Sequence, residues 1–266
     1  MTSRTNPQLL VEERGAAVWL TMNRPQSLNG INPQIIAGLD AALDEIEARR
    51  EPPSAVVLTG TGRAFCTGGE MKDMEDGQGG YRSAVHIFSN VSRVIRRMEQ
   101  LPIPVIGAIN GLCIAGGIEL ALGCDLVIAV KSARFGDGHA NFGLIPGAGG
   151  TVRLPRRIGL NRARLMMYTA KLFPAETMFD WGLVTDVCED DALEAAVEKL
   201  VSDLAKKSPR GLALMKSLTA AGEATAEIDA ALAHEIDVCV QHDASKDRAE
   251  GLAAFAQKRK PKFVGG

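Results

Sequence analysis

The sequence predicts an α/β layered fold with mostly parallel strands, followed by a helical C-terminal region. Through residue 190, short apolar runs alternate with longer segments of helical periodicity, as in strands joined by crossover helices. After residue 187, only helical patterns follow one another. The chain has 266 residues, of which 46% are hydrophobic and 23% are charged. This suits one globular domain, or one with a small appendage.

The first 60 residues are expected to form three strands and one helix. Strands are predicted at residues 9–12, 17–22 and 55–59. Asn32 is expected to cap a helix with Pro33 at its first position, because Asn accepts a hydrogen bond from an early helical amide and Pro lacks an amide N–H. The apolar residues of this helix follow helical spacing and predict that it packs on a core: Ile35, Ile36, Leu39, Leu43 and Ile46.

The middle of the chain continues the alternation, and its end does not. The middle elements are expected to be a loop at residues 60–73, a helix at 83–100, a strand at 105–109, a helix opened by Gly116 and a strand at 126–130. Four helical patterns then follow, at residues 190–206, 209–221, 226–242 and 245–258. We expect these helices to pack on the core, on a neighbouring subunit, or on both. The chain therefore divides into a core, residues 1–189, and a C-terminal helical region, residues 190–266.

Composition and motifs argue against several classes of function. A net charge of −2 gives no general attraction to nucleic acid or to membranes, and no apolar run is long enough to span a bilayer. The start of the chain lacks the apolar stretch of a secretory signal, and the five cysteines include no C-x-x-C pair, which favours a reducing cytoplasm. The four histidines lack metal-ligand spacing, so no metal site is expected.

The most informative segment is PVIGAINGLCIAGGIELALGCD, residues 104–125. Glu119 is a lone carboxylate in the first turn of an apolar helix, so we expect it to be buried. Burial raises its pKa unless the unpaired amides and the dipole of that turn hold the ionised form. The Gly116 amide has no side chain in front of it and is available to an anion. The two form a candidate catalytic pair, although a first-turn Glu and a Gly pair also serve stability and close packing alone.

A second glycine loop, TGTGRAFCTGGEMKDM, spans residues 59–74. Its Gly68-Gly69 pair lets a backbone amide face a ligand at close range, and by itself it also fits an ordinary turn. With the Gly116 loop it supplies a second backbone donor, and two converging donors make an oxyanion hole. We therefore expect one backbone amide from each glycine loop to stabilise negative charge on a carbonyl oxygen.

These motifs and their order along nearly the whole chain resemble the enoyl-CoA hydratase/isomerase, or crotonase, superfamily. The resemblance rests on NRPQSLNGI at 23–31, AFCTGGEMKDM at 64–74, the segment 104–125, ARFGDGHANFGLIPGAGGTVRLPRRIG at 133–159, WGLVTDV at 181–187 and EGLAAFAQKRKPKF at 250–263. It implies a spiral of strand-strand-helix (ββα) units with a C-terminal helical region. It also implies trimers, often paired into hexamers. The implied substrate is an acyl-CoA thioester, with coenzyme A as part of the substrate and no tightly bound cofactor.

The resemblance also implies roles for particular residues. Glu119 and the amides of Gly69 and Gly116 would be catalytic, the amides holding the thioester oxygen as it gains enolate charge. Contacts with the coenzyme A part are implied for Arg24, Ser27 and Leu28 at the nucleotide end, for Glu70, Met71 and Lys72 along the pantetheine arm, and for Phe255 and Lys258, often from a neighbouring subunit. The basic run around Lys258 fits a solvated tail equally well.

The chain departs from the family at the second catalytic carboxylate. Family hydratases use two glutamates, one on each side of the water that is added. The first corresponds to Glu119, and the place of the second holds His139. Histidine acts as an acid or a base near neutral pH, so we predict that His139 works with Glu119. Asp137, two residues earlier, is placed to lie on the same side. In the alternative interpretation, His139 makes only a structural hydrogen bond to the backbone.

The sequence therefore predicts a cytoplasmic enzyme that hydrates 2-enoyl-CoA or dehydrates the product. Two alternatives stay open: another CoA-thioester reaction, such as decarboxylation or carbon–carbon bond cleavage, and an inactive acyl-CoA-binding scaffold. A family branch that cleaves β-diketones carries a histidine near this place with an acid in the following glycine turn, where this chain has Ala148. Isomerisation is expected less than hydration, because family isomerases usually keep a carboxylate at the place of His139. Residues 74–100 are expected to shape the acyl pocket.

Overall fold

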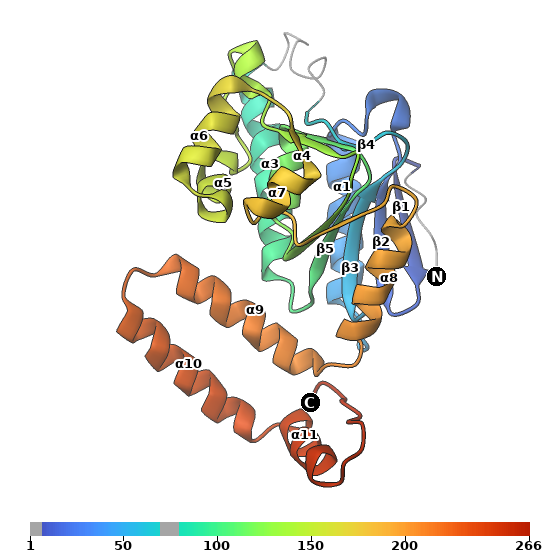
Figure 1. The fold of residues 1–266 in the computed structure, drawn as a ribbon, viewed down its shortest axis with the longest axis vertical. Helices are drawn as coiled ribbons and strands as arrows, with labels where there is room; N and C mark the ends of the chain where they lie inside the picture. Colours follow the sequence, from blue (N-terminus) through green and yellow to red (C-terminus); the bar gives the residue numbers. More distant parts are fainter. Residues whose placement is uncertain (1–6, 70–79) are drawn as a thin grey trace.

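Two β-sheets, surrounded by helices, form the body of the molecule (Figure 1). A computed structural model describes residues 7–69 and 80–266, with side chains from residue 89 onward in the second range. The larger sheet has the order β1-β2-β3-β5-β7-β10: β1 (Leu9–Arg14), β2 (Ala17–Met22), β3 (Ala55–Gly60), β5 (Val105–Ile109), β7 (Leu126–Val130) and β10 (Asp186–Cys188). Only β1 and β2 pair antiparallel in it.

The smaller sheet brings together three strands that each follow a strand of the larger sheet, and a fourth that follows helix α6 (Leu160–Thr169). Its order is β4-β6-β8-β9: β4 (Ala64–Cys66), β6 (Leu112–Ile114), β8 (Arg134–Gly136) and β9 (Phe173–Pro174). The first three strands are parallel to one another, and β9 pairs antiparallel with β8. Because parallel strands end at the same edge of a sheet, the segments that follow β4, β6 and β8 meet in one place.

The chain repeats one unit three times: a strand of the larger sheet, a strand of the smaller sheet, then a helix. The units are β3-β4 with α3 (Gly80–Gln100), β5-β6 with α4 (Gly116–Leu122), and β7-β8 with the 3-10 helix η2 (His139–Phe142) and α5 (Gly150–Ile158). This is the predicted spiral of ββα units. Two short helices, α6 (Leu160–Thr169) and α7 (Ala175–Asp180), lead to β10.

The N-terminal elements form as the sequence predicts. Helix α1 (Pro33–Glu47) begins after Asn32, whose side chain accepts a hydrogen bond from the Ile35 amide at 2.9 Å. The five apolar residues with helical spacing are buried in the main core. Before α1, the short 3-10 helix η1 (Pro25–Ser27) lies in a loop that the buried side chain of Asn29 ties to the β3–β4 turn, through hydrogen bonds to the carbonyls of Thr61 and Ala64.

The small strands β4 and β6 lie where the sequence predicted a loop and a turn, so that expectation was wrong. Each is only three residues long, and the pairing with a partner from another unit, not a local pattern, makes it a strand. The approach of the units is very close. A Cβ atom on Gly117 would lie 2.1 Å from the Cys66 carbonyl oxygen, so only glycine fits there.

Four helices end the chain, as predicted, with shifted ends: α8 (Leu193–Leu204), α9 (Pro209–Ala224), α10 (Ile228–Asp243) and α11 (Lys246–Ala256). Helix α8 contacts β5 and β7 and buries Leu193, Val197 and Val201. Helices α9 and α10 form a hairpin that extends away from the sheets, with α11 beyond it (Figure 1). The division of the chain at residue 190 stays a prediction.

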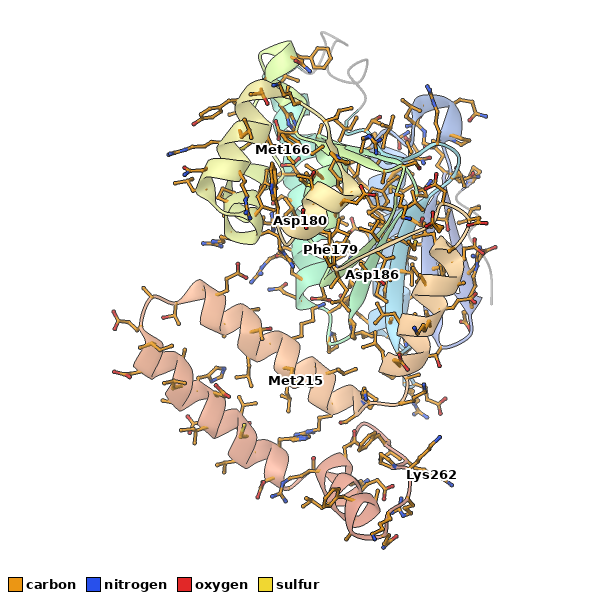
Figure 2. The ribbon with its side chains drawn as sticks, viewed as in Figure 1. Met166, Phe179, Asp180, Asp186, Met215 and Lys262 are labelled. Atoms are coloured by element: carbon orange, nitrogen blue, oxygen red, sulfur yellow. The ribbon has the colours of Figure 1, made fainter. Side chains whose placement is uncertain are left out.

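Lys216 fastens the α9–α10 hairpin to the body. Its ammonium group donates to the carbonyls of Met98 (2.9 Å) and Ile103 (3.0 Å) and to the Asp125 carboxylate (2.7 Å). The preceding residue, Met215, is labelled on α9 in Figure 2 and is 57% exposed. Over the part of the chain that the structure describes, no helix is both long and apolar enough to cross a membrane.

Candidate active site

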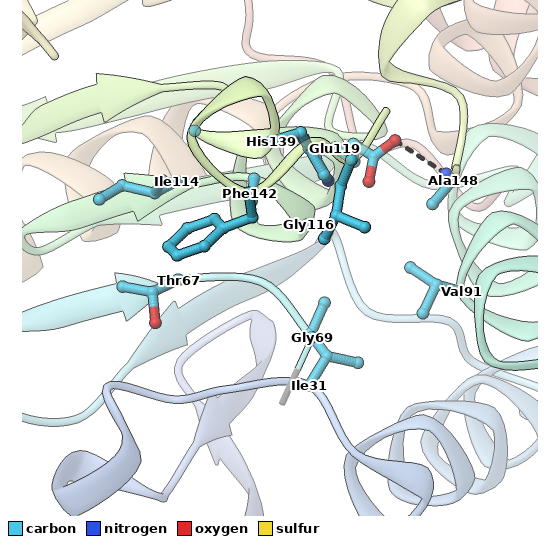
Figure 3. A pocket seen from close by; sticks show the side chains of 13 residues that line it. Ile31, Thr67, Gly69, Val91, Ile114, Gly116, Glu119, His139, Phe142 and Ala148 are labelled. Atoms are coloured by element: carbon cyan, nitrogen blue, oxygen red, sulfur yellow. Dashed lines mark hydrogen bonds between the residues drawn. The ribbon is translucent and has the colours of Figure 1, made fainter. Parts of the chain in front are cut away.

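A cavity opens where the three ββα units meet, beyond the ends of β4, β6 and β8 (Figure 3). Its lining combines a few polar groups with an apolar wall: Ile31, Thr67, Gly69, Val91, Ile114, Ala115, Gly116, Glu119, Gly138, His139, Phe142, Leu144 and Ala148. The four predicted catalytic residues are all among them. The structure therefore brings together Gly69, Gly116, Glu119 and His139, which are as much as 70 positions apart in the chain.

The two glycine loops touch each other at one end of the cavity. A Cβ atom on Gly116 would lie 3.1 Å from Cα of Gly68, and one on Gly68, whose φ is +96°, would lie 3.0 Å from the Gly116 nitrogen. Side chains would therefore separate the loops. Within the described ranges, the amides of Gly69 and Gly116 donate no hydrogen bond to another residue. Two backbone donors on one cavity wall match the expected oxyanion hole, whose role stays a prediction.

Glu119 is buried, as predicted, but the groups that hold it come from another helix. Its carboxylate oxygen Oε1 accepts hydrogen bonds from the amides of Ala148 and Gly150, both at 2.8 Å (Figure 3 draws the first). These amides belong to the glycine turn before α5 and to its first residue. The expectation that the first turn of its own helix would hold the carboxylate was wrong, because the side chain extends across the cavity.

The charge state of Glu119 reflects opposing effects. Burial raises its pKa, and the two amides and the positive charge of His139 oppose that rise without cancelling it. The net pKa is above the ordinary glutamate value, so burial outweighs the donors, a balance that the sequence left open. A carboxylate of this kind is a stronger base than an exposed one, and it retains one oxygen, Oε2, that the two amides do not use.

His139 is bound to a carboxylate and not only to the backbone. Its ring nitrogen Nδ1 lies 3.1 Å from Oδ2 of Asp137, and its amide donates to Oδ1 of the same side chain at 3.2 Å. Asp137 therefore lies on the same side as His139, as expected. Burial lowers the pKa of His139, but the hydrogen bond and charge of Asp137, together with the charge of Glu119, outweigh this and leave the pKa raised.

The loop predicted to meet the nucleotide end of coenzyme A lies next to the cavity. The carbonyl of Leu28 accepts a hydrogen bond from Thr67, at 3.4 Å, and Thr67 lines the cavity. The Ser27 hydroxyl and one arm of the Arg24 guanidinium bond to carbonyls of this same loop, at 3.3 and 2.7 Å. The loop is therefore well fixed beside the cavity, and its contact with coenzyme A stays a prediction.

Of the other predicted coenzyme A contacts, Phe255 and Lys258 do not line this cavity. Glu70, Met71 and Lys72 lie outside the described residues. Phe255, which is 86% exposed, lies in the last turn of α11, and Lys258 follows that helix. In Figure 1, α11 lies beyond the α9–α10 hairpin, away from the two sheets. The use of Phe255 and Lys258 at an active site therefore requires the cavity of a second subunit, as the family resemblance implies. That use stays a prediction.

Sequence reasoning gave no role in the site to several residues of the lining, among them Thr67 and Phe142, and it missed the contribution of Ala148. Phe142 ends η2, three residues after His139, and its ring faces the cavity in Figure 3 although the residue is 62% exposed. Ala148 matters through its amide, which no side-chain pattern reveals. In the described ranges no group of three or more His, Cys, Asp or Glu side chains is arranged to hold a metal ion.

Comparisons with known proteins agree with this architecture. The family model for enoyl-CoA hydratase/isomerase matches residues 12–266. A short-chain-enoyl-CoA hydratase of Clostridium acetobutylicum is 33% identical over 253 residues, 95% of each chain. A 1,2-epoxyphenylacetyl-CoA isomerase of Escherichia coli is 37% identical over 92% of this chain and 94% of its own.

Solved structures confirm the fold class. The crystal structure of an enoyl-CoA hydratase from Bacillus anthracis matches with a TM-score of 0.92 at 33% identity, covering 97% of this chain and all of that one. A second hydratase structure, from Geobacillus kaustophilus, matches with a TM-score of 0.90 at 32% identity, over 97% and 98% of the two chains. The α/β fold of ββα units with C-terminal helices, predicted from the sequence, is thus confirmed.

Proposed function

The chain belongs to the enoyl-CoA hydratase/isomerase family, and from this we propose that it hydrates 2-enoyl-CoA thioesters and catalyses the reverse dehydration. Acyl-CoA processing follows from the family. The specific reaction rests on one observation: Glu119 and His139 line the same cavity as the amides of Gly69 and Gly116. An acid, a base and two anion-stabilising donors are the groups that addition of water to a conjugated thioester requires.

The two glycine amides bind the thioester oxygen in this proposal. When water adds to the β-carbon, electrons move through the double bond to that oxygen, which becomes an enolate. Donors fixed in the folded backbone stabilise the enolate without reorganising. Each is worth about 3–4 kcal/mol of barrier. The close approach of the two loops at Gly68 and Gly116 supports such a fixed arrangement.

Glu119 and His139 move the protons. Oε1 of Glu119 is already bound to two amides, so Oε2 accepts the proton of the water whose oxygen bonds to the β-carbon. His139 in its protonated form then gives the Nε2 proton to the α-carbon, and the enolate collapses to the hydroxyacyl thioester. The proton left on Glu119 returns to His139 through water, which restores both groups. The raised pKa values of both residues support these roles.

Isomerisation is the second candidate, because the same groups perform it. Removing a proton from one carbon of an acyl chain and returning it to another needs the oxyanion donors and one acid–base pair, but no bound water. One relative that is 37% identical carries the name of an isomerase of 1,2-epoxyphenylacetyl-CoA. Product analysis separates the two reactions, since hydration adds a water molecule and isomerisation leaves the mass of the thioester unchanged.

Hydration of crotonyl-CoA, followed by the loss of absorbance of the conjugated thioester, tests the proposal. We expect turnover by the wild-type protein and a loss of about 100-fold or more in kcat for Glu119→Gln. Glu198→Gln on the exposed face of α8 is the matched control and should keep full activity. A wild-type protein that binds crotonyl-CoA without converting it would contradict the proposal and support a binding scaffold. One that only shifts the double bond of 3-enoyl-CoA would support the isomerase.

Variants at residue 139 test the second acid–base group. His139→Ala should lower kcat about 100-fold, because no other side chain replaces its proton. His139→Glu restores the carboxylate that family hydratases have at this place, and we expect it to recover part of the rate. Unchanged turnover in His139→Ala would remove histidine from the mechanism while leaving Glu119 in place.

A further inference from the structure

In the turn between β8 and η2, the Asp137 side chain contacts both the backbone amide and the ring of His139. Asp137 follows the last residue of β8, and Gly138, with a φ of +73°, turns the chain back so that His139 begins η2. Oδ1 of Asp137 accepts the His139 backbone amide, and Oδ2 faces its ring nitrogen Nδ1. Asp137 as a whole is 1% exposed. A group held at both oxygens cannot rotate without losing a hydrogen bond.

From this geometry we propose that Asp137 is a positioning residue that fixes the tautomer and direction of the His139 ring. An ionised carboxylate only accepts hydrogen bonds, so the Nδ1 facing it carries a hydrogen atom. In the neutral ring Nε2 is then the unprotonated nitrogen, and the proton that makes the ring cationic is added at Nε2. That is the nitrogen left for the cavity, which His139 lines. Family hydratases do not need such a partner, because a glutamate occupies the place of His139.

Two carboxylates act on the ring from two different elements. Asp137 belongs to the same segment, and Glu119 reaches it from α4. Among the residues the structure describes, these are the charged groups with a resolved effect on the protonation of His139. Asp137 alone contacts Nδ1, whereas Glu119 is occupied by the amides of Ala148 and Gly150. The two therefore have separate functions: Asp137 orients the ring, and Glu119 shares the cavity with it.

Nuclear magnetic resonance of the imidazole nitrogens tests the proposal without any substrate. The chain has four histidines, so the His139 signals of uniformly 15N-labelled protein are assigned by their loss in His139→Gln. In the wild type at a pH where the ring is neutral, we expect Nδ1 protonated and Nε2 unprotonated. The opposite tautomer, or an equal mixture of both, would overturn the proposal. This measurement needs no variant of Asp137 and so does not depend on how such a variant folds.

Asp137→Asn adds a second arm of the same experiment. The amide NH₂ of Asn donates a hydrogen bond, so it should face an unprotonated Nδ1 and move the ring proton to Nε2. The titration midpoint of His139 should also fall, because the negative charge beside the ring is gone. The other histidines, His86, His234 and His242, serve as internal controls with unchanged signals. An unchanged tautomer and midpoint for His139 in Asp137→Asn would contradict the proposal.

Measurements of turnover connect the positioning role of Asp137 to the proposed function. Only this part of the experiment rests on that proposed function. If His139 donates a proton, hydration falls as the pH rises through its pKa. Asp137→Asn should move that falling limb to lower pH and reduce kcat about 10-fold or more, with little change in KM. A protein with the expected ring tautomer but no hydratase activity would refute the proposed function and keep the inference. A hydratase whose pH profile and kcat are unchanged in Asp137→Asn would refute the inference.

Discussion

The ionised carboxylate of Glu119 lowers the stability of the folded protein, because it is buried. The carboxylate is 3% exposed, and burial raises its pKa above the ordinary value of 4.5 despite two amide donors. The folded state therefore binds this proton more tightly than the unfolded state does. It follows that folding loses stability as the pH rises through the pKa of the folded state, because ionising a buried group is less favourable than ionising an exposed one.

Glu119→Gln is therefore expected to stabilise the protein while it removes activity. Gln keeps an oxygen that accepts the amides of Ala148 and Gly150 but carries no charge. Above the raised pKa we expect a gain of about 1 kcal/mol, or roughly 2–4 °C in Tm. The gain should shrink as the pH falls and vanish below about pH 4.5, where the wild-type carboxyl is also neutral. Thermal melts across pH check this, and a pH-independent loss of Tm in the variant would contradict it.

At the scale of single residues, the sequence predicts which side chains form the candidate site better than it predicts their hydrogen-bond partners. The lone carboxylate in an apolar segment predicted the burial of Glu119, and the family resemblance implied that His139 would share its cavity. The donors to Glu119 are 29 and 31 positions away in the chain. They are backbone amides, so no side-chain pattern marks them, and only the packing of α5 against α4 brings them there.

The turn that holds Glu119 directly precedes helix α5. An ion pair between Arg153 on α5 and Glu99 on α3, here called the clamp, fixes this turn. The Arg153 guanidinium, on α5, bonds to both oxygens of Glu99 on α3, at 2.5 and 3.1 Å, and donates to the Ala148 carbonyl at 3.0 Å. The amide of Ala148 is one of the two that hold Glu119. The clamp therefore connects α3 to the peptide beside the carboxylate. Burial raises the pKa of Glu99, but Arg153 outweighs it and leaves that pKa lowered.

Arg153→Ala is expected to destabilise the protein by about 1–3 kcal/mol, because it removes two hydrogen bonds from the partly buried Glu99 carboxylate, which retains Arg96, and one from the Ala148 carbonyl. The loss of unfolding free energy should be largest at neutral pH. It should be smaller in acid, because protonated Glu99 carries no charge and interacts only weakly with Arg153. Urea unfolding at both pH values measures it. Arg156→Ala, three residues along on the exposed side of α5, is the control and should stay within about 0.5 kcal/mol of wild type. Equal effects of the two substitutions would contradict the clamp.

The elements that the sequence predicts best are those that carry their own pattern. The strands β5 and β7 have the predicted ends, since each is a run of five apolar residues closed by turn residues. Helix α1 has the predicted cap. The strands β4 and β6 carry no such pattern, because three residues are too few to show alternation. These short strands nevertheless determine where the site lies, so its position follows from tertiary pairing and not from local sequence.

At the scale of the whole molecule, helix α10 presents an apolar face that is exposed in the described part of the chain. The exposed residues recur every four positions and so lie along one side of the helix: Ile228 (69% exposed), Leu232 (49%), Ile236 (63%) and Val240 (67%). A stripe of this kind is typical of a subunit interface. It agrees with the trimer or hexamer that the family resemblance implies for this chain.

We therefore expect Val240→Asp to weaken self-association. Placing a charge within an apolar contact costs several kcal/mol unless it finds a partner. Sedimentation velocity should show a trimer or hexamer for the wild type and smaller species for the variant. Glu235→Gln, exposed on the same helix, is the control and should assemble like the wild type. A wild-type chain that sediments as a monomer would contradict both the interface and the contribution of Phe255 to a second cavity.

The three repeated units divide the work of the cavity among themselves. The first supplies Gly69 after β4, the second Gly116 and Glu119 after β6, and the third Asp137 and His139 after β8. In the proposed mechanism, units one and two therefore bind the thioester oxygen, whereas His139, the residue that departs from the family, belongs to unit three. A substitution in the turn after β8 would then change the last proton transfer without changing the two glycine loops. The proposed binding of the thioester oxygen and the proposed last proton transfer thus depend on different turns of the fold.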